Sequence, residues 1–439
     1  MLKTLVGAFK NKDIRKKILY TLMILVIVRV GSLLPIPGVD TEYFSSLLSG
    51  INTGDLSYLS AFTGGSFERM SLFALSITPY ITSSIIMQLL AIAIPKLEEM
   101  QKEGEDGRKK IAAITRYVTI ALALIESIAM AVGFGRSGLI KGYQGFSTLH
   151  YIVSIIVVVA TLTAGSAMLM WLGERITENG VGNGISIVLL INIISGMPSD
   201  FATLYSTFVA PRTIAKGVLA AAIIIAILVV MVVLVCFLQD GERRIPVQYS
   251  QKVSGRKTFG GQSTNIPLKV NTAGVMPVIF ASSLMQFPVI IAQLFGKSYE
   301  WTRYLSSSYW CRISAPKYSI GLILYIVLLI IFAYLYTSIT FNPIEVADNL
   351  KKAGGVIPGI TPGKSTSDYL NNILNYIVFV GAVGLLIIAL IPIMCTGFFN
   401  ASVSFGGTSV IIIVGVVLET LKQIESQMVN RYYKGFLSE

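Results

Sequence analysis

Long apolar runs recur along the chain and are separated by short segments rich in charged residues. Because a membrane-spanning helix needs about 20 mostly apolar residues, these runs are candidate spans. There are ten of them: 18–34, 70–94, 117–135, 151–173, 185–197, 217–238, 272–295, 318–341, 371–395 and 405–421. The pattern predicts an all-α integral membrane protein with ten transmembrane helices.

The second run, ALSITPYITSSIIMQLLAIAIP at 74–95, contains a proline and several polar side chains. Pro79 predicts a kink in this helix. Lipid offers polar groups no partners, so these must face protein or water. We expect hydrogen bonds, worth roughly 0.6–2 kcal/mol each, across a seam with the seventh run. The paired side chains would be Thr82, Ser83, Ser84 and Gln88 on one side and Ser282, Ser283 and Gln286 on the other.

Two pairs of runs share a spacing. Counting from Pro79 and from Pro277, the second and seventh runs each have Ile at +2, Ser at +5, Met at +8 and Gln at +9. The fifth and tenth runs match as GNGISIVL (182–189) and GGTSVIII (406–413). With an odd number of spans in each half, the second half enters the membrane upside down. The sequence therefore predicts two inverted five-helix halves with a path near their shared axis.

This repeat sets the predicted domain organisation. The N-terminal half covers 1–197 and the C-terminal half covers 198–425, which includes two long cytosolic loops at 239–271 and 341–369. Residues 426–439 form a cytosolic tail.

Composition and charge agree with a membrane protein and set its orientation. The 439 residues are 54% hydrophobic and only 13% charged, with a mean hydropathy of +0.71. If the N-terminus is cytosolic, the cytosolic segments hold 25 Lys and Arg residues and the outer loops hold 9. The positive-inside rule then places both termini in the cytosol. Most of the net charge of +12 follows from this bias, so it gives little reason to expect nucleic-acid binding.

Catalytic and metal-binding patterns are missing from the sequence. The cysteines, Cys236, Cys311 and Cys395, are too scattered for a metal cluster, and His150 is the only histidine. The PGKS segment is not a P-loop, because Pro358 stands where the first glycine is required. No HExxH, Ser/His or paired-Asp arrangement occurs. We expect no enzymatic activity, no cofactor and no metal.

The matched positions of the repeat carry bulky aliphatic side chains. Ile81 and Ile279 share one position, and Leu189 and Ile412 share another. On a path along the axis, such side chains would constrict it, and a hydrocarbon ring blocks ions by dewetting. Ordinary helix packing is the alternative for any one of them.

A secondary transporter is the alternative function, since transporters share inverted repeats and broken helices. An ion-coupled transporter needs ionisable or carbonyl ligands at mid-membrane depth. The spans offer only Arg29, which can snorkel to the outer surface, and Glu126, which has no evident cationic partner.

The two long loops carry pairs of basic residues. These are Arg243 and Arg244, Arg256 and Lys257, and Lys351 and Lys352. Length and charge together favour docking surfaces for a large acidic partner, ribosomal RNA included. A merely solvated loop is the alternative.

Several long motifs resemble those of the SecY family, the channel-forming subunits of the bacterial Sec protein translocon. They are PIPGVD (35–40), SAFTGGSFERMSLFALSITPYITSSIIMQLL (60–90), KEGEDGRKKI (102–111), MWLGERITENGVGNGISI (170–187), QSTNIPLKVNTAGVMPVIFASS (262–283), FNPIEVADNLKKAGG (341–355) and FGGTS (405–409). The resemblance covers about residues 15–425.

The resemblance implies a pore for unfolded secretory polypeptides that also opens sideways into lipid. Its pore ring would be Ile77, Ile81, Ile185, Leu189, Ile279 and Ile412. A displaceable plug helix would cover about 59–69, centred on Phe62, Thr63, Gly64 and Gly65. The lateral gate would include Thr82, Gln88, Ser282 and Phe287.

The resemblance also implies partners and a location. The partners would be SecE and SecG subunits, the SecA ATPase, the ribosome, signal peptides with nascent secretory or membrane proteins, and the lipid bilayer. The location would be the bacterial plasma (inner) membrane. One motif departs from the family, because Thr361 stands where an arginine associated with motor coupling is usual. That contact with the motor is therefore in doubt.

Overall fold

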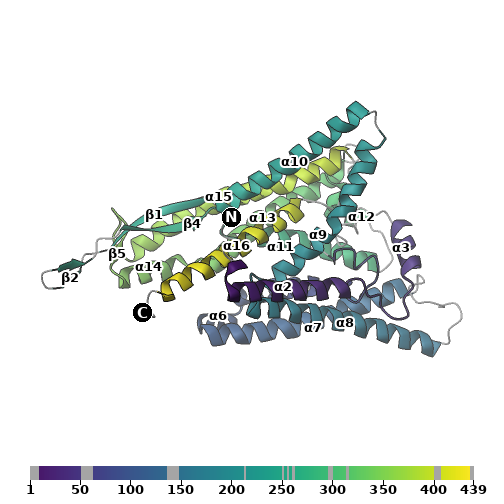
Figure 1. Cartoon of the computed structure of the whole chain (residues 1–439), viewed down its shortest axis with the longest axis horizontal. Helices are drawn as coiled ribbons and strands as arrows, with labels where there is room; N and C mark the ends of the chain where they lie inside the picture. The colour runs from purple at the N-terminus through teal and green to yellow at the C-terminus, as the bar shows by residue number, and fades with distance from the viewer. Residues whose placement is uncertain are drawn as a thin grey trace.

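The computed structural model describes most of the chain. The described residues are 9–50, 63–135, 148–211, 214–249, 252–254, 257–259, 263–294, 300–312, 316–399 and 407–435. Within them the protein is mostly helical, with a small β-sheet at one end (Figure 1).

The longer helices follow the apolar runs. They are α2 (Lys12–Gly31), α5 (Thr78–Ala93), α7 (Glu105–Phe134), α8 (Thr148–Asn179), α9 (Gly184–Leu204), α10 (Ile214–Asp240), α11 (Met276–Leu294), α13 (Ile320–Thr340), α15 (Lys364–Phe399) and α16 (Gly407–Gly435). The shorter ones are α3 (Thr41–Gly50), α6 (Pro95–Lys102), η3 (Tyr205–Val209), α12 (Glu300–Leu305), η4 (Ser307–Tyr309), η5 (Pro316–Ser319) and α14 (Pro343–Lys352).

Each of the ten predicted runs overlaps one of the longer helices. Among the described residues, six helices are long and apolar enough to cross a membrane, or seven if the bent pair α5 and α6 forms one span. The protein is thus a helical membrane protein with several spans, and the full count of ten stays a prediction.

The second run folds differently from the prediction. Residues 70–77 form turns, and α5 begins only at Thr78, with Pro79 in its first turn. Pro79 therefore starts a helix and does not kink one, because the first helical turn needs no N–H from that residue. A second proline, Pro95, begins α6, and the chain bends by 104° between the two helices.

The matched runs hold equivalent places in their helices. Pro277 is the second residue of α11, as Pro79 is of α5. Ser186 and Ser409 are each the third residue of their helices, α9 and α16. These equivalences are what an internal repeat would give.

The helices pack around a large apolar core. Near one side, α7 packs against α8 and α5, while α2 also lies against α8 (Figure 1). On the other side, α15 packs against both α13 and α16, and α10 also packs against α16. The core cluster draws side chains from both groups, including Leu169 of the first and Leu385 of the second.

The two long loops form one small β-structure. Strands β1 (Glu242–Tyr249) and β4 (Ser263–Lys269) pair antiparallel, and β5 (Gly355–Val356) from the second loop pairs with the end of β1. A separate hairpin joins β2 (Lys252–Ser254) and β3 (Lys257–Phe259). Pro246 lies in β1 beyond the reach of β5, where a missing N–H costs no ladder bond. The expected all-α fold thus carries a sheet.

The sheet rests on the first turns of α15. Ile245, Val247 and Leu268 of the sheet are buried in one cluster with Leu370 and Ile373 of α15. At about 1.5 Å per residue, the 36 residues of α15 are longer than a bilayer core is thick, so this helix can hold the sheet outside the membrane.

Two predicted boundaries fall within helices. The division between 197 and 198 lies inside α9, and the tail that begins at 426 continues α16, which ends at Gly435. A continuous helix supplies no linker at either point.

Candidate functional site

The six aliphatic residues predicted to form a ring belong to one apolar cluster. Five of them are buried: Ile77, Ile81, Leu189, Ile279 and Ile412. Ile185 is half-buried and packs against the same cluster.

The elements that carry these side chains come from both predicted halves. Ile77 caps the N-terminus of α5 and Ile81 lies one turn further, while Ile185 and Leu189 have the same spacing on α9. Residues four apart stack on one helix face. Across the halves, α9 packs against α16 and α5 contacts α11.

A constriction of hydrocarbon alone excludes water and ions when narrow, and it offers no group that would bind a solute. The same cluster also holds helix-packing residues such as Leu329 and Leu385. Clustering therefore agrees with a ring but does not separate it from ordinary core packing, and the ring stays a prediction.

Part of the predicted plug lies beside this cluster. Phe62 and residues 59–61 fall outside the described residues. Thr63 and Gly64 are buried, and Gly64 and Gly65 have φ angles of +62° and +78°. Left-handed residues end a right-handed helix, so the two glycines form a turn and are not part of the expected helix.

Two polar side chains contact this turn, and the sequence did not predict either contact. Arg29 of α2 donates a hydrogen bond from Nη1 to the Gly64 carbonyl oxygen at 3.2 Å. Ser195 Oγ of α9 lies 3.5 Å from the same oxygen. Arg29 thus binds the segment that the sequence predicts as the plug, whereas the sequence alone had suggested that this side chain can snorkel to the outer surface.

A second contact joins α9 to the segment before α5. Asn192 Nδ2 donates to Ser76 Oγ at 3.1 Å, and Ser76 has a φ of +53°. Asn192 is buried one turn after Leu189. The signal in the sequence was a single asparagine within an apolar run, IVLLINII.

The predicted seam between the second and seventh runs is not built as expected. Ser83 Oγ donates to the Thr115 carbonyl of α7 at 2.9 Å, and Thr82 Oγ1 donates to Thr78 in its own helix. Ser282 hydrogen-bonds Tyr325 of α13. Hydroxyl groups bond more readily to nearby carbonyl oxygens and side chains than across the limited contact between α5 and α11.

Two amides remain poorly satisfied near that contact. Gln88 Nε2 donates to Ser84 Oγ at 3.4 Å, but its Oε1 is buried without a hydrogen-bond partner. Gln286 Oε1 is buried without one as well. Phe287, the fourth predicted gate residue, is 41% exposed. The contact between α5 and α11, called the α5–α11 wall below, therefore contains buried polar atoms that lack hydrogen bonds.

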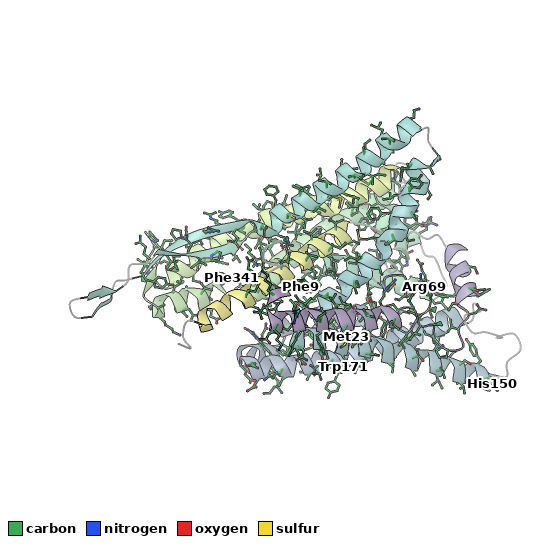
Figure 2. The ribbon with its side chains drawn as sticks, viewed as in Figure 1. Phe9, Met23, Arg69, His150, Trp171 and Phe341 are labelled. Atoms are coloured by element: carbon green, nitrogen blue, oxygen red, sulfur yellow. The ribbon has the colours of Figure 1, made fainter. Side chains whose placement is uncertain are left out.

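The basic residues of the two loops lie mainly on the surface of the β-structure. Arg243 and Arg244 are exposed on β1, and Lys351 and Lys352 are exposed in the last turn of α14. Arg256 falls outside the described residues, and Lys257 begins β3. Figure 2 shows Phe341 toward this end of the molecule and Arg69 and His150 toward the other.

Other candidate chemistry is sparse. Among the residues that the structure describes, no group of three metal-ligating side chains gathers, and the three cysteines are free. Glu126, midway along α7, forms no ion pair within this part of the chain.

Comparison with known proteins decides the family. The SecY family model matches residues 71–421. The chain belongs to the SecY family. SecY from Streptomyces scabiei, described as a protein translocase subunit, is 44% identical over 445 residues, and each chain is covered completely. SecY from Halalkalibacterium halodurans, described in the same words, is 42% identical over 445 residues, again with complete coverage of both.

Solved structures show the same fold at lower identity. A protein-conducting channel has a TM-score of 0.61 and 18% identity, covering 94% of this chain and 93% of its own. Sec61 in a canine ribosome–channel complex has a TM-score of 0.59 and 18% identity, with the same coverage. As a SecY family member, the chain is a protein-translocation channel subunit and not an enzyme. This membership does not favour the alternative, a secondary transporter.

Proposed function

We propose that this chain forms a pore that passes unfolded secretory polypeptides across the bacterial plasma membrane and releases hydrophobic segments sideways into lipid. The observation that carries the proposal is that the six aliphatic residues, five of them buried, belong to one apolar cluster to which α5, α9, α11 and α16 contribute. A flexible hydrocarbon ring is suited to seal around an arbitrary peptide, because it makes no sequence-specific contacts.

In this mechanism the plug turn covers the ring at rest. Arg29 holds the Gly64 carbonyl oxygen, and a hydrogen bond to a charged group contributes about 1.5–3 kcal/mol. A signal peptide with about ten apolar residues gains about 3–6 kcal/mol on reaching lipid. That gain is sufficient to offset the loss of the plug contact and shift the equilibrium to the open state.

The sideways exit lies between α5 and α7 on one side and α11 and α13 on the other. The unsatisfied amide oxygens of Gln88 and Gln286 support this location, because a wall with unpaired buried groups is easier to part. Thr82, Ser282 and Phe287 line the same region.

The β-structure and α14 form the cytosolic docking surface in this proposal. The ribosome and the SecA ATPase would bind Arg243, Arg244, Lys351 and Lys352, all of which are exposed. Sec61 and Ssh1, which share the fold, have been solved in ribosome complexes. Thr361 lies in an exposed turn, where its side chain cannot supply the charge of an arginine.

The remaining subunits would be SecE and SecG, which would cover lipid-facing helices. Helix α10 offers such a surface, with Val218, Leu219 and Phe237 all more than 60% exposed. Both termini would be cytosolic, as the distribution of Lys and Arg predicts.

Crosslinking of a translocating chain tests the pore. Single cysteines replace Ile81, Ile279 or, as a control on the exposed surface of α10, Val218 in a variant without Cys236, Cys311 and Cys395. A stalled secretory chain carrying a thiol-reactive probe should crosslink at 81 and 279 and not at 218. Equal crosslinking at all three positions, or at 218 alone, would place the path elsewhere.

A further inference from the structure

A cluster of cations and aromatic rings lies at the end of the molecule opposite the sheet, in the segment that contains α12, η4 and η5 (Figure 1). Residues 300–319 contain three cations, Arg303, Arg312 and Lys317, against one carboxylate, Glu300. This segment joins α11 to α13 and therefore lies at a membrane boundary.

The cations converge on two tyrosine rings. The Cζ atoms of Arg303 and Arg312 lie 5.8 Å and 4.9 Å from the centroid of the Tyr309 ring. Lys317 Nζ lies 5.0 Å from the centroid of Tyr318, whose ring is 6.0 Å from that of Tyr309. Arg303 and Lys317 also both hydrogen-bond Tyr318. Three positive charges thus share a small platform.

The platform is packed firmly against the start of α13. Trp310 is buried, and its Nε1 donates to the Tyr304 carbonyl at 2.8 Å. A side chain at Gly321 would collide with that same carbonyl and with Trp310. The cations are therefore presented by an ordered support.

The platform keeps a net positive charge, because the one carboxylate, Glu300, interacts with Arg303 and Lys317 but offsets only one of the three cations. Within the described part of the chain, none of the three cations takes part in a salt bridge, and Arg312 Nε is buried without a hydrogen-bond partner. Ring faces attract cations but carry no net charge, so the positive charges continue to repel one another. A group with formal negative charge would relieve this repulsion.

An apolar stripe begins beside the platform. Ile320, Ile323, Leu324 and Val327 of α13 are each at least 45% exposed. Their spacing places them on one helix face. Trp301 is also exposed, as is usual for tryptophan at the edge of a bilayer.

We propose that this platform binds the phosphate of an anionic phospholipid, with the acyl chains along the exposed stripe of α13. The cations match the headgroup charge, and the stripe matches the chains that follow it. Two arginines and a lysine provide several N–H donors for phosphate oxygens. The proposal requires only that the chain spans a membrane and is independent of the proposed pore.

Tryptophan quenching by brominated lipids tests the site. The chain has three tryptophans, and replacing Trp171 by Phe leaves only Trp301 and Trp310, both in this segment. The full-length chain is reconstituted in phosphatidylcholine vesicles that contain either brominated phosphatidylglycerol or brominated phosphatidylcholine. We expect a preference of at least about fivefold for phosphatidylglycerol, since one cation near a membrane surface contributes about 1 kcal/mol.

Charge removal should abolish this preference. The combined variant Arg303→Gln, Arg312→Gln and Lys317→Gln should quench equally with both lipids, whereas Lys216→Gln, which removes an exposed cation near the start of α10, should keep the preference. The charge-conserving Arg303→Lys should keep it too, and it covers the case in which the triple variant fails to fold. Equal quenching in the parent, or an unchanged preference in a folded triple variant, would overturn the proposal.

Two competitors distinguish other ligands. Inorganic phosphate at millimolar concentration should not reduce quenching, because it lacks acyl chains. An acidic peptide such as polyglutamate should not reduce it either. Displacement by either competitor would assign the cations to a soluble anion or to an acidic protein segment and would contradict a lipid site.

Discussion

Arg29 and Gly64 are joined by one hydrogen bond, from the guanidinium of the first long helix to a carbonyl in the turn that is proposed as the plug. The contact links segments 35 residues apart in the chain. In the proposed mechanism this bond gives a charged side chain within a span a definite role, because Arg29 would fix the segment that covers the aliphatic cluster.

Replacing Arg29 by Leu should loosen this cover. Loss of a hydrogen bond worth about 1.5 kcal/mol or more raises the population of the displaced state about tenfold. We expect a higher resting ion conductance across planar bilayers. Arg69→Gln removes an exposed arginine from the same segment and serves as the control, with conductance near that of the parent. An unchanged resting conductance in Arg29→Leu would show that the bond from Arg29 to Gly64 does not keep the proposed plug in place.

The aliphatic ring makes its own prediction. Glycine at Ile81 and Ile279 together removes two buried side chains from opposite halves and should let water and ions leak when the plug is displaced. Single-channel recording should show more frequent or larger openings than in the parent. Ile223→Gly, on the exposed surface of α10, should not change conductance. Similar currents in all three proteins would argue for simple core packing.

Gln286→Leu should favour the closed state of the α5–α11 wall. The leucine removes a buried oxygen that has no partner, which stabilises the closed packing by about 1 kcal/mol or more. Export of proteins with weakened signal sequences should fall about fivefold, while strong signals are less affected. Ser83→Ala, which removes a bond from α5 to α7 within one half, is the control. If Gln286→Leu instead speeds the export of proteins with weakened signal sequences, the substitution favours the open state, and the prediction is wrong.

In the proposed docking surface, the contribution of charge to ribosome binding can be tested separately from the stability of the sheet that carries it. Arg243→Gln with Arg244→Gln should weaken ribosome binding and reduce its salt dependence, without changing thermal stability. Ile245→Ala should instead destabilise the sheet by about 2–5 kcal/mol, because Ile245 is buried against α15. Binding titrations at several salt concentrations, together with thermal unfolding, measure the two effects. Unaltered binding in the double arginine variant would move the docking site elsewhere.

Much of the helical pattern could be predicted because apolar runs and repeated spacings are local features of the sequence. The equivalence of Ile81 with Ile279 came from such spacing, and both side chains are buried in the same cluster. The kink assigned to Pro79 was wrong because proline also favours the first turn of a helix, and its neighbours alone do not distinguish the two cases.

Contacts that depend on tertiary structure could not be predicted. The bond from Asn192 to Ser76 needs a left-handed serine, which no local pattern indicates. The expected seam failed for a related reason, since Ser83 and Ser282 found partners on other neighbouring helices. Polar residues in a span indicate that a partner exists but not which helix supplies it.

The two residues of β5 are too few to give a periodicity, yet they join loops about 100 residues apart. Gln248 pairs with Val356, and Tyr249 pairs with Gly355, so the two loops form one structural unit. This unit packs against α15. A force applied to either loop is therefore transmitted to both loops and, through the long helix α15, into the bilayer. Two different partners bound to different loops would therefore act on the same β-structure and the same helix.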